Sequence, residues 1–152
     1  MTDRLNDSGG VIIRKFQSED YHALTNLWTK AGLPFKPEGR DQKEKMLREA
    51  SQSTASFWVA EHDGHVVASV LGTHDGRKGW INRLAVLPEF RGKGIAVQLV
   101  QAAEESLYSI GIEIIACLIE DDNQVSMNFF KRMGYVKHPD IIYFSKRKHS
   151  KV

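Results

Sequence analysis

The stretch RGKGIA at residues 91–96 joins two segments with different hydrophobic patterns. The segment before it, residues 80–86, is a short apolar run typical of a strand. Behind it, residues 95–110 carry apolar side chains at steps of three and four, which predict one face of a long helix ended by Gly111. Residues 114–119 then form a continuous apolar run, typical of a strand covered on both faces. This order predicts a βαβ crossover.

The rest of the chain divides into short strands and helices. Asp63-Gly64, between two β-rich runs, is a strong hairpin signal. The other expected elements are a strand at 11–16, a helix from 18 with Tyr21, Leu24, Leu27 and Trp28 on one face, a loop at 32–39, a helix at 41–50, hairpin strands at 56–61 and 66–71, a helix capped by Asp122-Asn123 and closed by Gly134, and one or two strands over 135–145. We therefore expect an α/β fold with one domain at 11–146, a flexible arm at 1–10 and a basic tail at 147–152.

Composition excludes several classes of protein. A chain of 152 residues with 41% hydrophobic content can bury one sizeable core without disulfides or a structural metal. A net charge of +2 is too small to argue for nucleic acid, and no apolar run approaches the 18 residues of a membrane span. The single cysteine, Cys117, cannot form an internal disulfide, so we expect a reducing, cytoplasmic location. The six histidines show no metal-ligand spacing, so we expect no metal site.

The glycines at the start of the long helix favour an anion site. They let the backbone approach a ligand closely, and a helix N-terminus offers unpaired N–H groups and the positive end of its dipole. Arg91 and Lys93 add positive charge, so a diphosphate fits best. A plain glycine turn is the alternative interpretation. A dinucleotide fingerprint fails at Val97, and a Walker A loop fails because the spacing from Gly72 to Gly76 is one residue too short.

Three patterns in this part of the chain occur in a fixed order, and the first two belong to one motif. LAVxP at 84–88 precedes RxxGxA at 91–96, and NxxSxxFFxxxGY follows at 123–135. Together they resemble the acetyl-CoA motif and the closing motif of the GCN5-related N-acetyltransferase (GNAT) family, among which the chain is most similar to small bacterial and archaeal acetyltransferases of the YpeA type. The resemblance covers residues 11–145. It implies a mixed, splayed sheet of about six to seven strands flanked by about four helices, with strands 80–86 and 114–119 diverging to admit pantetheine.

The resemblance also implies acetyl-CoA as co-substrate. Backbone groups of the expected strand at 80–86 would hold the pantetheine arm, and the amides of 91–96 would hold the pyrophosphate. A bulge in the strand at 80–86 would direct an N–H at the thioester carbonyl. The cofactor-binding residues implied in this way are Leu84, Ala85, Val86, Arg91, Gly92, Lys93, Gly94, Ile95, Ala96, Asn123 and Phe130.

The catalytic positions depart from the family pattern. Phe130 stands where relatives often have a tyrosine that protonates the leaving thiolate, and a phenylalanine has no hydroxyl. Asn82 stands where many relatives place a glutamate that accepts the amine proton. An amine must lose a proton to attack, so a base is still needed. Our candidates are Glu120, His74 and Asp75.

The expected activity is transfer of the acetyl group of acetyl-CoA to a primary amine by direct attack in a ternary complex. Phe35, Asp75 and Asn82 are expected at the acceptor, in or beside the glycine-containing loops 32–39 and 73–79. A regulatory acyl-CoA-binding module without turnover is the main alternative, and a generic anion-binding domain is a second one. Small amine, peptide N-terminus and protein lysine all remain open as acceptors, and monomer and homodimer as assembly states. We expect neither nucleic acid nor a membrane as partner.

Overall fold

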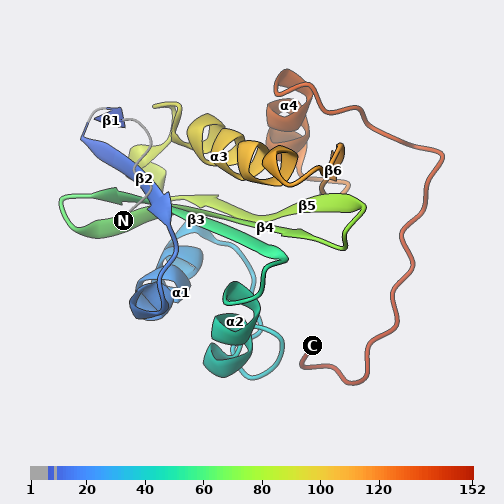
Figure 1. The fold of residues 1–152 in the computed structure, drawn as a ribbon, viewed down its shortest axis with the longest axis horizontal. Helices are drawn as coiled ribbons and strands as arrows, with labels where there is room; N and C mark the ends of the chain where they lie inside the picture. The colour runs from blue at the N-terminus through green and yellow to red at the C-terminus, as the bar shows by residue number, and fades with distance from the viewer. Residues whose placement is uncertain (1–6, 9) are drawn as a thin grey trace.

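Six strands form a single sheet in the computed structural model, which describes residues 7, 8 and 10–152. Their order in the sheet follows their order in the chain (Figure 1). Neighbouring strands are antiparallel except for the last pair, which is parallel. The strands are β1 (Asp7–Ser8), β2 (Val11–Lys15), β3 (Ala55–His62), β4 (His65–His74), β5 (Lys78–Val86) and β6 (Ile114–Ala116).

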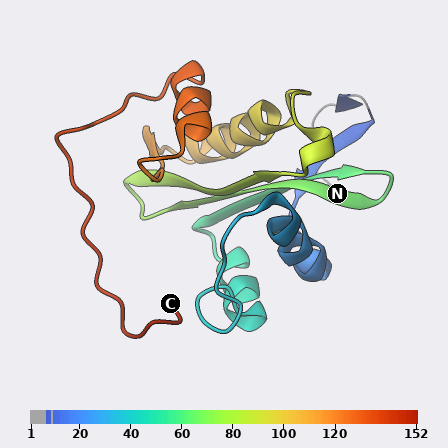
Figure 2. The same ribbon diagram turned by 180° about the vertical axis from the view of Figure 1, so that it is seen from behind.

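Helices cover both faces of this sheet. Figures 1 and 2 show α1 and α2 on one face and α3 and α4 on the other. The α-helices are α1 (Tyr21–Ala31), α2 (Lys43–Ala50), α3 (Ile95–Ser109) and α4 (Gln124–Arg132), and short 3-10 turns occur at Ser18–Asp20 and Pro88–Phe90. Among the residues the structure describes, no helix has the length and apolar character needed to cross a membrane.

Alternating side chains of the strands supply two cores. In β3, Trp58 and Ala60 pack in the core beneath α3, whereas Phe57 and Val59 pack in the core beneath α1 and α2. This alternation is the period of two that a strand imposes on its side chains. The apolar stripe of α3 fills the first core, and Trp28 of α1 is completely buried in the second. The sheet is therefore covered on both faces, as an α/β fold requires.

The predicted elements around the sheet are largely confirmed. The hairpin between β3 and β4 turns at Asp63 and Gly64, with φ of 48° and 78°, the left-handed pair that a two-residue turn needs. The long helix starts after Gly94 and is followed by Gly111. The last helix is capped as expected, since the side chain of Asn123 accepts a hydrogen bond from the amide of Ser126 at 3.1 Å.

The strands β5 and β6 separate soon after they meet. They pair only through three positions, from Lys78 opposite Ile114 to Trp80 opposite Ala116. The strand expected over 114–119 therefore ends at Ala116, because β5 has moved out of hydrogen-bonding reach. The divergence expected from the family resemblance is present, and it leaves residues 81–86 without a strand partner on the β6 side within the described chain.

Both ends of the chain differ from expectation. Asp7–Ser8 lies in the arm that we expected to be loose, yet it pairs with Val11 and Ile12 as β1; residues 1–6 and 9 lie outside the described part. No strand forms over 135–145, where one or two were expected. Although this segment has strand-like composition, a strand also needs a neighbouring backbone to pair with, and here the chain runs clear of the sheet (Figures 1 and 2).

Candidate active site

The loop after β5 has the geometry of an anion nest. Gly92 and Gly94 adopt φ of 76° and 79°, and Gly94 is the N-cap residue of α3. No side chain caps this helix, so the amides of its first turn stay available to a ligand. The loop 91–94 is exposed, and a Cβ at either glycine would have no neighbouring atom within 4 Å. Open space and unpaired amides at a helix N-terminus together suit a phosphate group.

The two basic side chains of this loop contact neighbouring residues of the chain. Arg91 donates from Nε to the carbonyl of Val86 at 3.1 Å and from Nη2 to the carbonyl of Ala31 at 3.4 Å, so it ties the end of β5 to the end of α1. The ammonium of Lys93 lies 5.2 Å from the ring centre of Phe90. Both charges stay beside the nest and raise its positive potential.

A bulge interrupts β5 where the two strands diverge. Ser69 of β4 pairs with Ala85, but Leu71 pairs with Asn82, so two residues of β5 face one of β4. Arg83 takes up the extra length with φ of 55°, a left-handed conformation that is uncommon for a residue other than glycine. The hydroxyl of Ser69 donates to the carbonyl of Arg83 at 2.9 Å. The bulge is thus held by a buried side chain of the neighbouring strand.

The side chain of Arg83 ties this bulge to the loop between α1 and α2. Its guanidinium donates to a carboxylate oxygen of Asp41 at 2.6 Å and to the carbonyl of Pro34, and it lies 5.0 Å from the ring centre of Trp28. Asp41 is buried and also accepts from the amide of Lys36 at 2.7 Å. Sequence reasoning missed both Arg83 and Asp41. They lie 42 positions apart, and no local pattern marks a left-handed arginine.

Phe130 is the one buried side chain of the closing motif 123–135. Phe130 is 6% exposed and packs edge-on against Phe129 and Tyr135, with ring centres 5.1 and 5.0 Å away. The hydroxyl of Tyr135 donates to Glu104 at 2.7 Å, and burial followed by this contact raises the pKa of Tyr135. A tyrosine with a raised pKa is a weaker acid, so Tyr135 is a poor substitute for the missing hydroxyl at position 130.

Two of the three expected bases are engaged in the turn between β4 and β5. Asp75 accepts from the amides of Lys78 and Arg77 at 2.8 and 2.9 Å, and these bonds lower its pKa. His74 accepts at Nδ1 from the amide of Gly76 at 3.0 Å, so the Nδ1 lone pair is already used. Glu120 is exposed in the loop after β6. The structure does not bring these three side chains together with the nest.

Sequence reasoning also missed the carboxylate of Glu49. Burial and then the charge of Asp41 raise the pKa of Glu49 in α2, although Arg83 opposes this shift. Its side chain still reaches solvent. The thiol of Cys117, in contrast, has its pKa raised to about 11 by burial, so little of it is the reactive thiolate near neutral pH.

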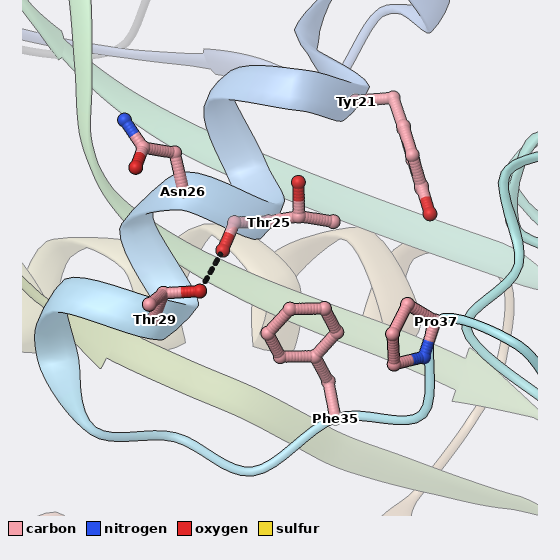
Figure 3. Close-up of a pocket in the computed structure, with 6 residues that line it drawn as sticks. All are labelled: Tyr21, Thr25, Asn26, Thr29, Phe35 and Pro37. Atoms are coloured by element: carbon pink, nitrogen blue, oxygen red, sulfur yellow. Dashed lines mark hydrogen bonds between the residues drawn. The ribbon is translucent and has the colours of Figure 1, made fainter.

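Phe35 and Asn82, expected at the acceptor, lie on the α1 and α2 side of the sheet, whereas Asp75 lies in the turn between β4 and β5. Phe35 lies 5.6 Å from the ring of Trp28 and borders a hollow of about 420 Å³. Figure 3 shows this hollow between α1 and the loop that carries Phe35 and Pro37. Asn82 is exposed opposite Leu71, and directly opposed residues share a face of the sheet, so Asn82 also faces this side.

A family model provides the decisive comparison. The model of the "Acetyltransferase (GNAT) family" matches residues 20–135, which include the bulge, the nest and the closing motif. The chain belongs to this family of acetyltransferases. The expected family and fold class are confirmed, and with them the expectation of an acetyltransferase. Among the described residues, no group of three or more His, Cys, Asp or Glu side chains is arranged to hold a metal ion.

Solved structures of low sequence identity share this GNAT fold. The aminoglycoside N-acetyltransferase AAC(6')-Iy, in complex with the bisubstrate analogue CoA-S-monomethyl-acetylneamine, is 20% identical with a TM-score of 0.74, over 90% of this chain and 98% of that one. The PaiA N-acetyltransferase of Thermoplasma acidophilum, in complex with coenzyme A, is 24% identical with a TM-score of 0.71, over 81% and 87%. Glucosamine-6-phosphate N-acetyltransferase of Arabidopsis thaliana is 18% identical with a TM-score of 0.68, over 91% and 99%.

Proposed function

We propose that this GNAT-family acetyltransferase transfers the acetyl group of acetyl-CoA to a primary amine by direct attack in a ternary complex. One observation carries the proposal. A phosphate-sized nest, formed by left-handed Gly92 and Gly94 at the head of α3, follows directly from the strand that bulges at Arg83 and diverges from β6. One extended ligand could occupy these three features in turn. Its pyrophosphate would lie on the nest, its pantetheine arm along the open edge of β5, and its thioester at the bulge.

The bulge supplies the chemistry at the thioester. A backbone N–H released from the ladder there can stabilise the negative charge that develops on the carbonyl oxygen when the amine attacks. The leaving thiolate, with a pKa near 8.5, costs only about 2 kcal/mol to release unprotonated at pH 7. Transfer can therefore proceed although Phe130 offers no proton.

Glu49 is our candidate for the base that takes the amine proton. A general base works best when its pKa is raised toward the operating pH, and burial and Asp41 act on Glu49 in this direction. Support comes from α2, the helix that carries Glu49, because it covers the same face of the sheet as Asn82 and Phe35 (Figure 1). The earlier candidates Asp75 and His74 have lone pairs already engaged in their turn.

Binding and turnover need separate tests. Titration calorimetry with acetyl-CoA tests the nest, and release of free CoA thiol with a panel of aminoglycosides, polyamines, amino sugars and peptides tests transfer. We expect micromolar binding and amine-dependent release. Binding without release for any amine would favour the regulatory module, which Phe130 and Asn82 suggest. Absence of binding would overturn both.

The base has its own test once an acceptor is known. Glu49→Gln should lower kcat by 100-fold or more, in line with a typical factor of about 10²–10⁴ for general base catalysis, and should abolish the acidic limb of the pH profile. Glu44→Gln, an exposed change at the start of the same helix, is the control. An unchanged pH profile in Glu49→Gln would exclude this role.

The acceptor loops are tested by kinetics. Phe35→Ala should raise KM for the amine and leave KM for acetyl-CoA unchanged, because Phe35 borders the hollow beside α1. Asp75→Asn tests the second expected loop in the same way. A change in acetyl-CoA affinity without a change in acceptor kinetics would contradict the assignment.

A further inference from the structure

Positive charge is concentrated in two segments of the chain. Residues 36–50, which comprise the end of the loop after α1 and the helix α2, and residues 146–152, at the end of the tail, together hold nine of the 21 basic residues but only four of the 19 acidic ones. Their net charge is therefore +5, whereas the rest of the chain, with 12 basic and 15 acidic residues, has a net charge of −3. The small overall charge of +2 conceals this separation.

The folded chain brings these two segments together. The ammonium of Lys151 lies 3.4 Å from the carboxylate of Glu38. A Cβ at Gly39 would lie 1.6 Å from the carbonyl oxygen of Lys151, so the backbone of the tail lies directly against the loop. Figures 1 and 2 show the C-terminal end beside this loop and α2. We call the basic side chains of residues 36–50 and 146–152 the basic face.

Most cations of the basic face have no acidic partner. Glu38 pairs with Lys151, and Asp41 is buried with its carboxylate 2.6 Å from the guanidinium of Arg83. Within the part of the chain that the structure describes, six exposed cations of this face take part in no ion pair: Lys36, Lys43, Lys45, Arg48, Lys146 and Lys148. Unpaired charges of one sign on one face attract a molecule of the opposite charge.

The basic face adjoins the side of the sheet where we place the acceptor. Lys36 follows Phe35, which borders the hollow beside α1. Arg48 precedes Glu49, our candidate base, in α2. An acceptor whose amine reaches Glu49 therefore has the rest of its structure close to these cations. They repel a polyamine and attract an acceptor that carries negative charge.

We propose that the acceptor amine belongs to an acidic polypeptide segment, which binds along the basic face while its lysine or N-terminal amine enters the site. This inference rests on the proposed function. The amine nitrogen forms a bond to the acetyl carbon, the C–S bond breaks, the thiolate of CoA leaves with the bonding electrons, and the amine proton passes to Glu49.

The extent of the basic face favours a polypeptide over a small anionic amine. The eight residues of α2 alone span about 12 Å, and the unpaired cations continue into the loop before it and the tail beside it. One phosphate or carboxylate neutralises part of this area, whereas successive acidic residues of an extended chain can face several cations. A polypeptide also carries the aliphatic amine that transfer requires, whereas the amino groups of nucleic acid bases are conjugated with the ring and are weak nucleophiles.

Three peptides of equal length test the preference for acidic chains. Each has a blocked N-terminus and one lysine, which is flanked by glutamates, glutamines or arginines. We expect kcat/KM to be highest for the glutamate peptide, at least about tenfold above the arginine peptide, and the difference to shrink at high salt. Equal values, or a preference for the arginine peptide, would overturn the proposal. If another amine is acetylated and none of the peptides is, the proposed function stands and this inference is wrong; if no amine is acetylated, both are wrong.

Substitutions in α2 test the basic face itself. Lys43→Gln with Lys45→Gln should raise KM for the glutamate peptide by about 2- to 30-fold, since each exposed ion pair contributes modestly, and should leave KM for acetyl-CoA and the Tm unchanged. Lys131→Gln with Lys137→Gln is the matched control, because these two lysines are equally exposed and lie outside the basic face. If KM for acetyl-CoA rose as much as KM for the peptide, the face would serve the cofactor and the proposal would be wrong.

Binding without turnover distinguishes the sources of negative charge. The fluorescence anisotropy of a labelled glutamate-rich peptide without lysine should show binding that the α2 double variant weakens and the control variant does not. Tighter binding of single-stranded RNA through the same lysines would assign the face to nucleic acid instead. A larger gain in kcat/KM from glucosamine to glucosamine-6-phosphate than from the glutamine to the glutamate peptide would assign it to a small anionic amine. Either result would overturn the polypeptide.

Discussion

The substitution Gly94→Val separates backbone strain from ligand binding. With φ of 79°, valine at this position costs about 1–2 kcal/mol, the penalty of a left-handed conformation, and a β-branched residue lies at the upper end. The Cβ of the new side chain would meet no protein atom within 4 Å, so the substitution adds bulk to the open space of the nest without a clash in the core. The effect on ligand binding is separate from this loss of folding stability. Losing one hydrogen bond to a charged phosphate weakens the binding free energy by about 1.5–3 kcal/mol, which raises Kd about 10- to 100-fold.

The chain offers a matched control for this experiment. Gly64, in the turn between β3 and β4, has φ of 78° and also has no atom within 4 Å of a Cβ. Gly64→Val and Gly94→Val should therefore lower the Tm by similar amounts. Calorimetry with acetyl-CoA should show a raised Kd for Gly94→Val alone. Equal affinities of the two variants would refute the argument that the pyrophosphate lies on these amides.

Three further predictions concern the ion pairs and the missing hydroxyl. Arg83→Ala should destabilise the fold by about 3 kcal/mol in urea, because it leaves the buried Asp41 only the longer, 3.7 Å contact with Arg40. It should also raise KM for the amine more than KM for acetyl-CoA, and equal effects on both would argue against an acceptor role for the loop. Asp20→Asn breaks a bidentate pair with Arg14 (2.8 and 2.9 Å) between side chains 11% and 10% exposed, and should cost about 3–5 kcal/mol at pH 7. Burial opposes ionisation of Asp20, but hydrogen bonds hold its pKa below the ordinary 3.8. The stabilisation by this pair is therefore complete above pH 3.8 and is lost as the pH falls through the lowered pKa. If the free energies of unfolding of wild type and Asp20→Asn still differed by the full amount at about pH 2, this reasoning would be wrong. Phe130→Tyr should raise the rate of transfer roughly tenfold with acetyl-CoA affinity unchanged, and an unchanged rate would mean that another donor already protonates the thiolate.

Local features of the site could be predicted because their causes are local. Two glycines before an amphipathic helix are sufficient to indicate the nest, and the stripe of apolar side chains in residues 95–110 is a property of the helix itself. The turn at Asp63-Gly64 depends on those two residues alone. The divergence of β5 from β6 was expected only from the family resemblance, since no hydrophobic pattern shows where two strands separate.

Sequence patterns were sufficient to predict the α/β fold class, the helix α3 with the glycine nest before it, the hairpin and the family. Four features could be found only in the folded chain: the bulge at Arg83, the pairing of Arg83 with Asp41, the raised pKa of Glu49 and the exposed apolar side chains at 141–144. The physical reason is the range of the interactions. Helix periodicity and turn conformation depend on neighbours a few residues away, whereas strand register, buried ion pairs and pKa shifts depend on groups that meet only when distant segments pack together.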